Sequence, residues 1–453
     1  MLNEQTMDIL PVENALAEDF TARSLFRFAF PTILMMIFFG LYTIVDTIFV
    51  ARGVNTDALS AINIVTPVLN LIVGLASMLA TGGSAIIARK MGDGNDSEAR
   101  RDFTMITATG AAIGILFTVF GLFYLDPLLR ALGASAVLIP YCRDYFGVLL
   151  AFAPVNMMQV LFASFFVTAG RPGLGMKVCI AAGLANVLFD YLFIFVFPMG
   201  IKGAAFATCI GYSIPTIAGI VFFFRNKQGT LFFSILKPDL SVLGECAFNG
   251  SSEMVGQLSA AVTTFLFNAA MMRLAGEDGV AAITIIIYSQ FLLTALFIGF
   301  SMGVAPVISY NYGSSNHLQL KKVIEISSVV ILVISVAVSV FALSFGGMLA
   351  GIFAPEGSEV YIIARTGFLI FPFAFLFVGF NIFTSAMFTA LSNGLLSAIL
   401  SFSRSLLIAL GIIYLPWFFG VNGVWLAVPL AEFASLILAV YIFSVNRKRY
   451  HYT

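Results

Sequence analysis

The chain has 453 residues, of which 60% are apolar and only 10% are charged, and its 23 basic and 23 acidic side chains give no net charge. Soluble domains carry about 25% charged residues, and a soluble fold of this length could not cover so much apolar surface. The composition therefore excludes a soluble enzyme, a disordered protein and a nucleic-acid binder.

The first 24 residues are predicted to form a cytosolic arm or surface helix. Residues 2–19 contain five acidic side chains and no basic one, whereas a secretory signal peptide begins with a positive segment.

Twelve apolar segments follow, each long enough to cross a hydrocarbon layer of roughly 30 Å. The predicted spans cover residues 26–50, 59–83, 103–124, 138–166, 176–198, 202–224, 244–271, 279–304, 323–345, 360–386, 395–417 and 422–444. Strands of a membrane barrel would instead alternate over about ten residues. We therefore expect an all-α polytopic membrane protein with 12 transmembrane helices.

The basic residues are unevenly distributed between the two sides of these spans. Sixteen lie in the terminal segments and in the loops after even-numbered spans, six lie on the other side, and Arg404 falls within a span. Because cytoplasmic loops are enriched in Lys and Arg, the bias predicts that both termini are cytoplasmic in a multi-pass protein of the cell membrane.

The second half of the chain matches the first half when Gly303 is aligned with Gly82. The same shift places Gly313 on Gly92. Six spans in each half give both halves the same orientation, so we predict two parallel, pseudo-symmetric six-helix lobes. Parallel repeats are typical of transporters that bind substrate between their halves and alternate by rocking.

The predicted boundaries follow from the repeat. They are a cytosolic arm at 1–24, an N-lobe at 25–225, a cytosolic loop at 226–243, a C-lobe at 244–445 and a cytosolic tail at 446–453.

The repeat is asymmetric in its buried acids. Asp46 aligns with Thr264, and Asp190 aligns with Gly411 or its neighbour Leu410. Charges at membrane depth are rare and costly, so each one is a functional hypothesis. Because the second half lacks these acids, we expect ion coupling to lie in the N-lobe.

The N-lobe candidates form two polar faces. Asp46 has neighbours on the first span, which are Tyr42, Thr43 and Thr47. On the fifth span, Asn186 and Asp190 lie four residues apart and therefore share a face.

Both acids are predicted at similar depth in the outer half of the membrane. Two carboxyls in a poorly hydrated pocket resist joint ionisation, which favours a bound proton. With the Asn186 carbonyl and the threonine hydroxyls, the same oxygens also suit Na⁺. The plainer alternative is a hydrogen-bonded acid that packs two helices.

The C-lobe offers further polar candidates for substrate contact or gating. A pair between Glu253 and Arg404 is expected either as a structural clamp or as part of the substrate path, and Glu432 as a structural or gating residue. Gln257, Tyr288 and Gln290 either line the cavity or form hydrogen bonds between helices.

The sequence lacks the residue patterns that nucleotide binding, hydrolysis or zinc catalysis would need. No phosphate-binding loop of the Walker type, no Ser/His/Asp arrangement and no HExxH pattern occurs, so we expect no cofactor and no enzyme. Apart from Na⁺ at Asp46, Asn186 and Asp190, no metal site is predicted, because the four cysteines lack the spacing of zinc ligands. An intramembrane enzyme remains only a remote alternative.

Several motifs together resemble the MATE (multidrug and toxic compound extrusion) family, and the MepA-like branch within it. They are Phe30-Pro31, Val45-Asp46-Thr47, Gly92-x-Gly94-Asn95, Thr168-Ala169-Gly170-Arg171-Pro172, Asn186-x-x-x-Asp190 and Gly200-x-x-Gly203-Ala204-Ala205. The resemblance covers about residues 20–445.

This resemblance implies that Asp46, Asn186 and Asp190 bind H⁺ or Na⁺, and that cation entry drives export of organic, often cationic compounds by rocker-switch antiport. It does not extend to a C-lobe cation site, because Glu253 lies early in its span and residues 360–386 contain no acid.

A lipid or polysaccharide-precursor flippase of the same superfamily is the alternative function. It would be expected to have a basic cavity for anionic headgroups, but Arg404 is the only basic residue well inside a span, and the others lie near span ends. The expected partners are small organic substrates and the lipid bilayer, with no nucleic acid, and we expect a monomer.

Overall fold

The computed structural model describes residues 14–452, and all regular elements in that range are helices. The first half contains η1 (Ala15–Ala17), α1 (Ala22–Gly53), α2 (Thr56–Gly92), α3 (Asp96–Phe123), α4 (Leu125–Ala131), α5 (Ile139–Ala151), α6 (Ala153–Thr168), α7 (Pro172–Tyr191), η2 (Leu192–Val196) and α8 (Gly200–Arg225). The second half contains α9 (Leu240–Asn249), α10 (Ser251–Gly313), α11 (His317–Phe353), α12 (Glu359–Ile370), η3 (Phe371–Ala374), α13 (Phe375–Ala390), α14 (Gly394–Phe419) and α15 (Val421–Tyr450).

Helices long and apolar enough to cross a membrane number ten in the described residues, or eleven when the pair α5–α6, bent by 55°, counts as one span. The 63-residue α10 would be roughly 95 Å long if it were straight. It bends instead at Gly276, where φ is 62° and ψ is −149°. Its first arm covers most of the seventh predicted segment, which begins in α9, and its second arm covers the eighth, so each of the twelve predicted segments contains helix.

Helix ends follow local chemistry. Asn55 and Asn393 cap α2 and α14, because their side-chain oxygens accept from the backbone N–H groups of Ala58 and Leu396. The break between α5 and α6 falls at Phe152, two residues before Pro154, whose missing N–H and ring favour a place in the first turn of a helix. These caps and the break near Pro154 end one helix and begin the next within a few residues, so the connections between the long helices are short.

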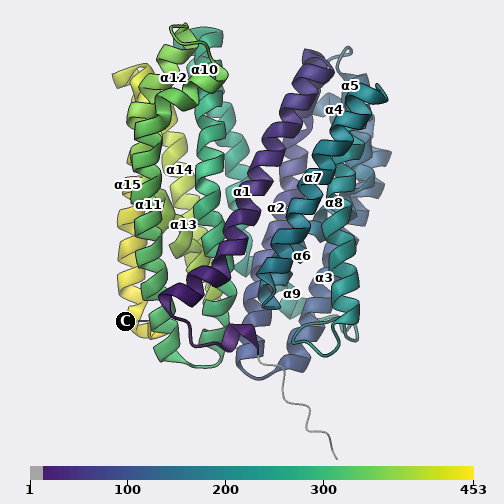
Figure 1. Ribbon diagram of the computed structural model, residues 1–453, viewed down its shortest axis with the longest axis vertical. Coiled ribbons are helices and arrows are strands. Elements are labelled where there is room, and N and C mark those ends of the chain that lie inside the picture. The colour runs from purple at the N-terminus through teal and green to yellow at the C-terminus, as the bar shows by residue number, and fades with distance from the viewer. Residues whose placement is uncertain (1–13, 453) are drawn as a thin grey trace, which may run out of the picture.

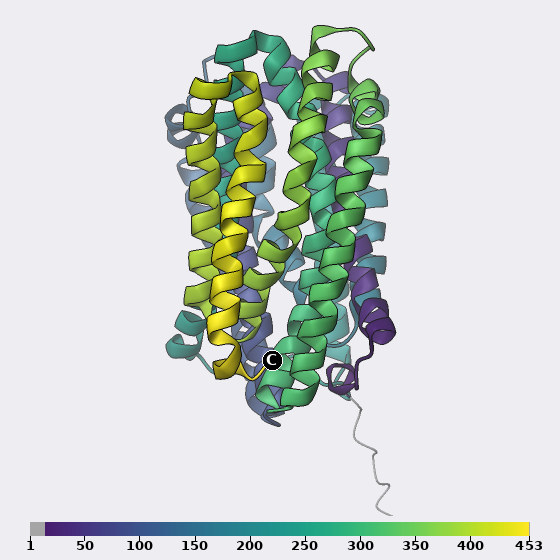
Figure 2. The same ribbon diagram turned by 90° about the vertical axis from the view of Figure 1, so that its left-hand side faces the viewer.

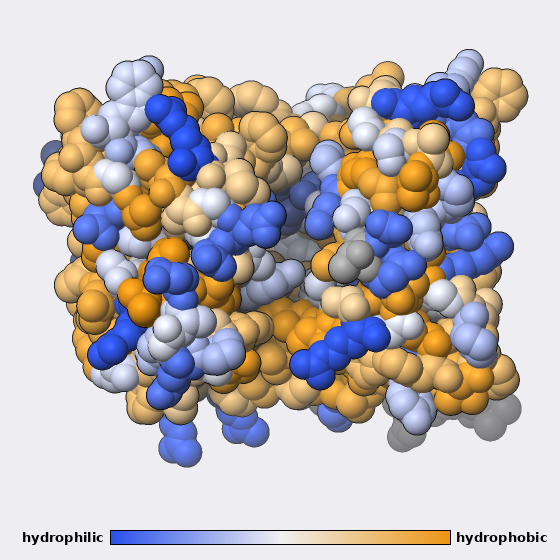
Figure 3. Space-filling view, turned by 90° about the horizontal axis from the view of Figure 1, so that it is seen from above, coloured by the Kyte–Doolittle hydropathy of each residue, from blue (hydrophilic) through white to orange (hydrophobic). Residues whose placement is uncertain are grey.

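The helices form two bundles, one built from α1–α8 and the other from α10–α15 (Figure 1). Between the bundles, α10 packs against α1 and α2, while α14 and α15 pair on the far side of the second bundle (Figure 2). We call the end that carries the C terminus the closed end and the opposite end the open end. Seen from the open end, the surface is hollowed between the two bundles (Figure 3).

A segment before α1 lies across the closed end. Leu16 and Phe20 are fully buried, and the Phe20 carbonyl accepts a hydrogen bond of 3.2 Å from Gln319 on α11. Ala15 packs against Gly170, which follows α6. The predicted arm at 1–24 is therefore packed from residue 14 onward and enters α1 at Ala22, while residues 1–13 lie outside the described residues.

The bend in α10 should depend on glycine at position 276. Its backbone conformation is one that side-chain-bearing residues reach only at about 1–3 kcal/mol, so Gly276→Ala should lower the free energy of unfolding by that amount. Chemical unfolding of the purified protein in mixed micelles would measure the change.

The control is Gly256→Ala, because Gly256 lies within the first arm of α10 and a methyl group there meets no atom within 4 Å. This variant should be neutral or slightly stabilising. Equal stability of the two variants would rule out a conformational requirement at Gly276.

Candidate functional site

The three N-lobe candidates come together where α1 packs against α7. Asp190 is fully buried, Asn186 is 2% exposed, and Asp46 is partly exposed. The Asp46 side chain interacts with the side chains of both Asp190 and Asn186. Residues from two helices that are far apart in the sequence thus form one cluster, as the predicted depths suggest.

The cluster contains more acceptors than donors. Among the described residues, Oδ1 of Asp46, both carboxyl oxygens of Asp190 and Oδ1 of Asn186 are buried and have no hydrogen-bond donor. Two carboxyls can share a hydrogen bond only when one of them holds a proton. Without a proton or another cation between them, these oxygens would repel one another in a region of low dielectric.

Two glycines let the helices around this cluster approach closely. A Cβ at Gly183 of α7 would lie 3.0 Å from Cδ1 of Tyr42, and one at Gly211 of α8 would lie 3.4 Å from Cβ of Asn186. The predicted neighbour Tyr42 therefore packs on α7, and Asn186 is held against α8.

Tyrosines from two other helices also surround the acids. Tyr145 of α5 and Tyr212 of α8 are electrostatic neighbours of Asp46, and Tyr145 is only 5% exposed. The sequence did not predict that these tyrosines lie near Asp46. The residue spacing within α5 or α8 does not show which of its faces points toward that acid.

The two threonines near Asp46 use their hydroxyl protons within α1. The Thr43 hydroxyl donates to the Phe39 carbonyl at 2.8 Å, and the Thr47 hydroxyl donates to the Thr43 carbonyl at 3.0 Å. Neither proton is therefore directed at Asp46, although the hydroxyl oxygens remain acceptors. Thr47 also interacts with Tyr288 of α10, which places Tyr288 against the opposite bundle.

In the second bundle, the ion pair differs from the expected one. Arg404 Nε donates to Glu432 Oε1 at 2.5 Å, and Asn381 Nδ2 donates to Glu432 Oε2 at 2.7 Å. Glu432 is fully buried. The expected pair of Glu253 with Arg404 is therefore wrong, because α15 rather than the first arm of α10 presents its acid to Arg404.

The remaining C-lobe candidates lie on α10. A Cβ added to Gly74 of α2 would lie 3.4 Å from the Cβ of Gln257, so Gln257 packs against α2. Glu253, one turn earlier, is partly exposed and forms no ion pair among the described residues. Gln290 is partly buried on the second arm.

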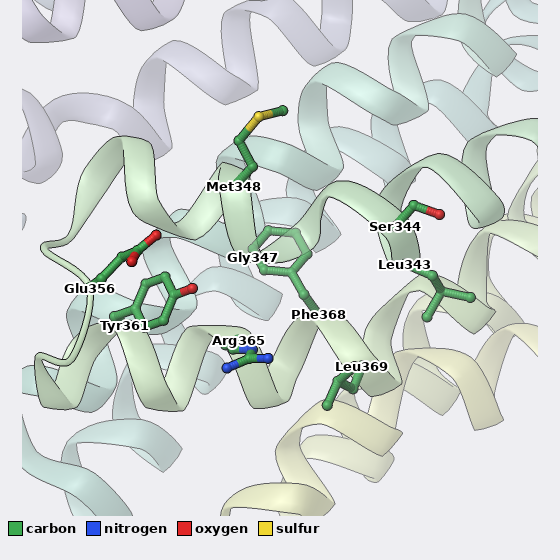
Figure 4. Close-up of a pocket in the computed structure, with 9 residues that line it drawn as sticks. All are labelled: Leu343, Ser344, Gly347, Met348, Glu356, Tyr361, Arg365, Phe368 and Leu369. Carbon is green, nitrogen blue, oxygen red and sulfur yellow. The ribbon is translucent and has the colours of Figure 1, made fainter.

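Cavities of about 420 Å³ occur elsewhere, one in each bundle. The cavity in Figure 4 lies between α11 and α12 and is lined by Glu356, Tyr361 and Arg365 together with apolar side chains. None of the candidate residues lines either cavity. Within residues 14–452, no group of three or more His, Cys, Asp or Glu side chains is placed to hold a metal ion.

Comparison with known proteins gives full-length matches. A family model described as MatE matches residues 31–192 and again 254–415. Multidrug export protein MepA of Staphylococcus saprophyticus is 22% identical over 436 residues, and that of Staphylococcus aureus is 23% identical over 434 residues, with 94% of each chain covered in both cases.

Solved structures share the fold. An outward-facing conformation of a multidrug resistance MATE family transporter of the MOP superfamily matches with a TM-score of 0.90 at 22% identity, covering 98% of this chain and 99% of that one. A MOP superfamily transporter from Pyrococcus furiosus matches with a TM-score of 0.89 at the same identity and coverage. The predicted all-α membrane fold and the family resemblance are thereby confirmed.

Breaking the buried ion pair from one side should be costly. Arg404→Met leaves the Glu432 carboxylate buried with only an amide partner, which should lower the free energy of unfolding by about 3–5 kcal/mol. Unfolding curves in mixed micelles would measure this loss.

The matched control is the double variant Arg404→Met/Glu432→Leu, which removes both charges and should recover most of the lost stability. A double variant no more stable than Arg404→Met would mean that the two losses are independent and that the pair is not an energetic unit.

Proposed function

The chain belongs to the MatE family of membrane transporters, and we propose that it is a cation-coupled antiporter that exports organic, often cationic compounds. The observation that carries this proposal is the cluster of donor-less carboxyl oxygens at Asp46 and Asp190. The relatives described as multidrug export proteins support the class of cargo.

The orientation in the membrane follows from the basic residues. Arg89, Lys90, Arg100 and Arg101 surround the turn between α2 and α3 at the closed end, and Arg447, Lys448 and Arg449 lie near the C terminus. We place this end in the cytoplasm, with lobe boundaries at 25–225 and 244–445, because positive loops stay on that side. The hollow between the bundles then opens to the outside (Figure 3).

The residues of the N-lobe bind the coupling ion. A proton on one carboxyl of the Asp46–Asp190 pair turns repulsion into a hydrogen bond, and Asn186 supplies an amide beside it. The same oxygens, with the accepting lone pairs of the threonine hydroxyls, form a set of hard ligands that suits Na⁺. Either ion neutralises charge within an apolar lobe and so favours tighter packing of α1 on α7.

Transport follows from coupling this binding to the arrangement of the lobes. In the outward-facing state the cation enters the N-lobe and the organic compound leaves the hollow. The loaded lobe then favours the inward-facing state, in which the cation leaves to the cytoplasm and a new compound binds between the lobes. The ion must bind the two states with different affinity for its gradient to do work.

The C-lobe has no corresponding exchangeable site. The buried carboxylate of Glu432 is already neutralised by Arg404 and hydrogen-bonded to Asn381. This fixed pair also neutralises Arg404, the arginine deepest within a predicted span, which disfavours binding of the anionic headgroups that a flippase moves. Glu253, Gln257, Tyr288 and Gln290 remain as substrate or gating residues of the α10 wall.

Removing either N-lobe carboxylate should uncouple export from the ion gradient. Asp190→Asn and Asp46→Asn keep the side-chain volume but cannot exchange a proton, so gradient-driven efflux of a cationic dye should fall at least about tenfold. Everted vesicles with matched transporter content would measure dye uptake.

The control is Asp93→Asn, since Asp93 is an exposed acid in the turn after α2. It should transport like the wild type. Wild-type rates in Asp190→Asn would assign the buried acid to helix packing alone.

Imposed gradients should identify the coupling ion. In everted vesicles, a proton gradient without Na⁺ should drive dye uptake if a proton bridges the carboxyls, and a Na⁺ gradient at uniform pH should drive it if Na⁺ does. Wild-type vesicles that accumulate no dye under either gradient would contradict the proposed antiport.

A further inference from the structure

The two lobes touch at the closed end through a pair of glycines that the internal repeat relates to each other. A Cβ on Gly92 of α2 would lie 2.1 Å from the carbonyl oxygen of Tyr310, and a Cβ on Gly313 of α10 would lie 2.1 Å from that of Arg89. The shift that superimposes the two halves of the sequence converts Gly92 into Gly313 and Arg89 into Tyr310. The contact therefore maps onto itself and marks the axis between the lobes.

A second contact lies further along α2 toward the membrane. A Cβ on Gly82 would lie 2.1 Å from the Cys246 carbonyl oxygen, and one on Gly250 would lie 1.9 Å from that of Met78. These positions join α2 to the junction of α9 and α10. Both carbonyl oxygens belong to the backbone, so rotating a side chain would not remove the clash with an added Cβ.

The repeat supplies the counterpart of this second contact on the other side of the axis. A Cβ on Gly303 of α10 would lie 2.9 Å from Cα of Ala29 on α1. The same shift converts Gly82 into Gly303, and α1 takes the place that the α9–α10 junction has in the second contact. We call the contacts at Gly92–Gly313, Gly82–Gly250 and Gly303–Ala29 the glycine seal.

Real Cβ atoms almost never approach other atoms within 3.0 Å, so each glycine of the seal excludes a side chain while the lobes touch. At Gly92–Gly313 and Gly82–Gly250, the atoms nearest to each added Cβ all belong to the backbone of the other lobe. Such a surface separates and closes again as a rigid body, without repacking of rotamers. The nearby ion pair of Arg89 with Glu245, at 2.9 Å, is partly exposed and contributes little to the closure.

We propose that the glycine seal is the cytoplasmic gate of the transporter, which closes because its glycines lack side chains and opens whenever the inward-facing state forms. This inference rests on the alternating access proposed above, and it assigns gating residues that the cation site does not include. A methyl group at Gly92 or Gly313 would wedge the lobes apart at the axis and shift the population toward the inward-facing state.

A native residue reports on the gate. Cys246 is fully buried against α2, its Sγ atom donates to the Leu79 carbonyl at 3.5 Å, and its own carbonyl faces Gly82. Separation of α2 from the α9–α10 junction would expose this thiol to the cytoplasm. The other cysteines, Cys142, Cys179 and Cys209, lie within the first bundle and can be replaced by alanine.

The experiment follows the labelling rate of single-cysteine protein in everted vesicles with a membrane-impermeant maleimide. Labelling of Cys246 should be slow in the parent and at least about fivefold faster in Gly92→Ala and in Gly313→Ala. Gly303→Ala, on the other side of the axis, should also accelerate it, because the lobes part as units.

The matched control is Gly244→Ala, which lies two residues from Cys246 but where a methyl group meets no atom within 4 Å. It should label like the parent. Variants are compared only when their size-exclusion profiles match that of the parent. Labelling within twofold of this control in all three seal variants would overturn the proposal.

A cross-link tests the gate without altering any glycine. Arg89→Cys/Glu245→Cys, in a background with Cys246 and the other cysteines replaced, carries thiols on either side of the seal. A bifunctional methanethiosulfonate reagent, which forms a disulfide with each thiol, should stop dye transport, and reduction of those disulfides should restore it. Continued transport by cross-linked protein would overturn the gate, whereas absence of transport in the unmodified wild type would instead count against the proposed antiport.

Discussion

The proposed ion coupling depends on two carboxyls that lie close together inside an apolar lobe, where Oδ1 of Asp46 and both carboxyl oxygens of Asp190 lack a hydrogen-bond donor. Burying one uncompensated carboxylate at membrane depth is costly, and burying two close together is more so. Gly183 and Gly211 let α1, α7 and α8 approach closely around Asp46, Asn186 and Asp190. In the proposed mechanism, a bound cation therefore stabilises this lobe.

The internal repeat makes the contrast between the lobes informative. The second bundle also buries an acid, Glu432, but supplies its own cation in Arg404 and a third partner in Asn381. A tethered guanidinium cannot leave, so Glu432 keeps its cation. In the proposed mechanism, the N-lobe exchanges its cation with solution and the Glu432 pair does not, which would give a symmetric scaffold a direction for energy input.

The sequence predicted those features that depend on composition and period. Long apolar runs gave the helices, and the internal repeat gave the two similar halves, with a family assignment that the full-length matches confirm. The grouping of Asp46 with Asp190 followed from equal depth on two spans. The partner of Arg404 could not be predicted, because depth alone does not distinguish Glu253 from Glu432, and the choice depends on how α14 packs on α15. Tyr145 was missed for the same reason, since its place near Asp46 depends on how α5 packs on α2 and α8.

The segment that precedes α1 has a mechanical consequence. Its carbonyl at Phe20 is held by Gln319 of one bundle, while Ala15 rests against Gly170 of the other. A peptide spans at most about 3.3–3.6 Å per residue, so the five steps between these anchors reach roughly 17 Å when fully drawn out. Part of this segment is coiled in η1, so the segment can lengthen if η1 unwinds. As long as both contacts hold, the extended length of this segment limits how far the two bundles can separate at the closed end.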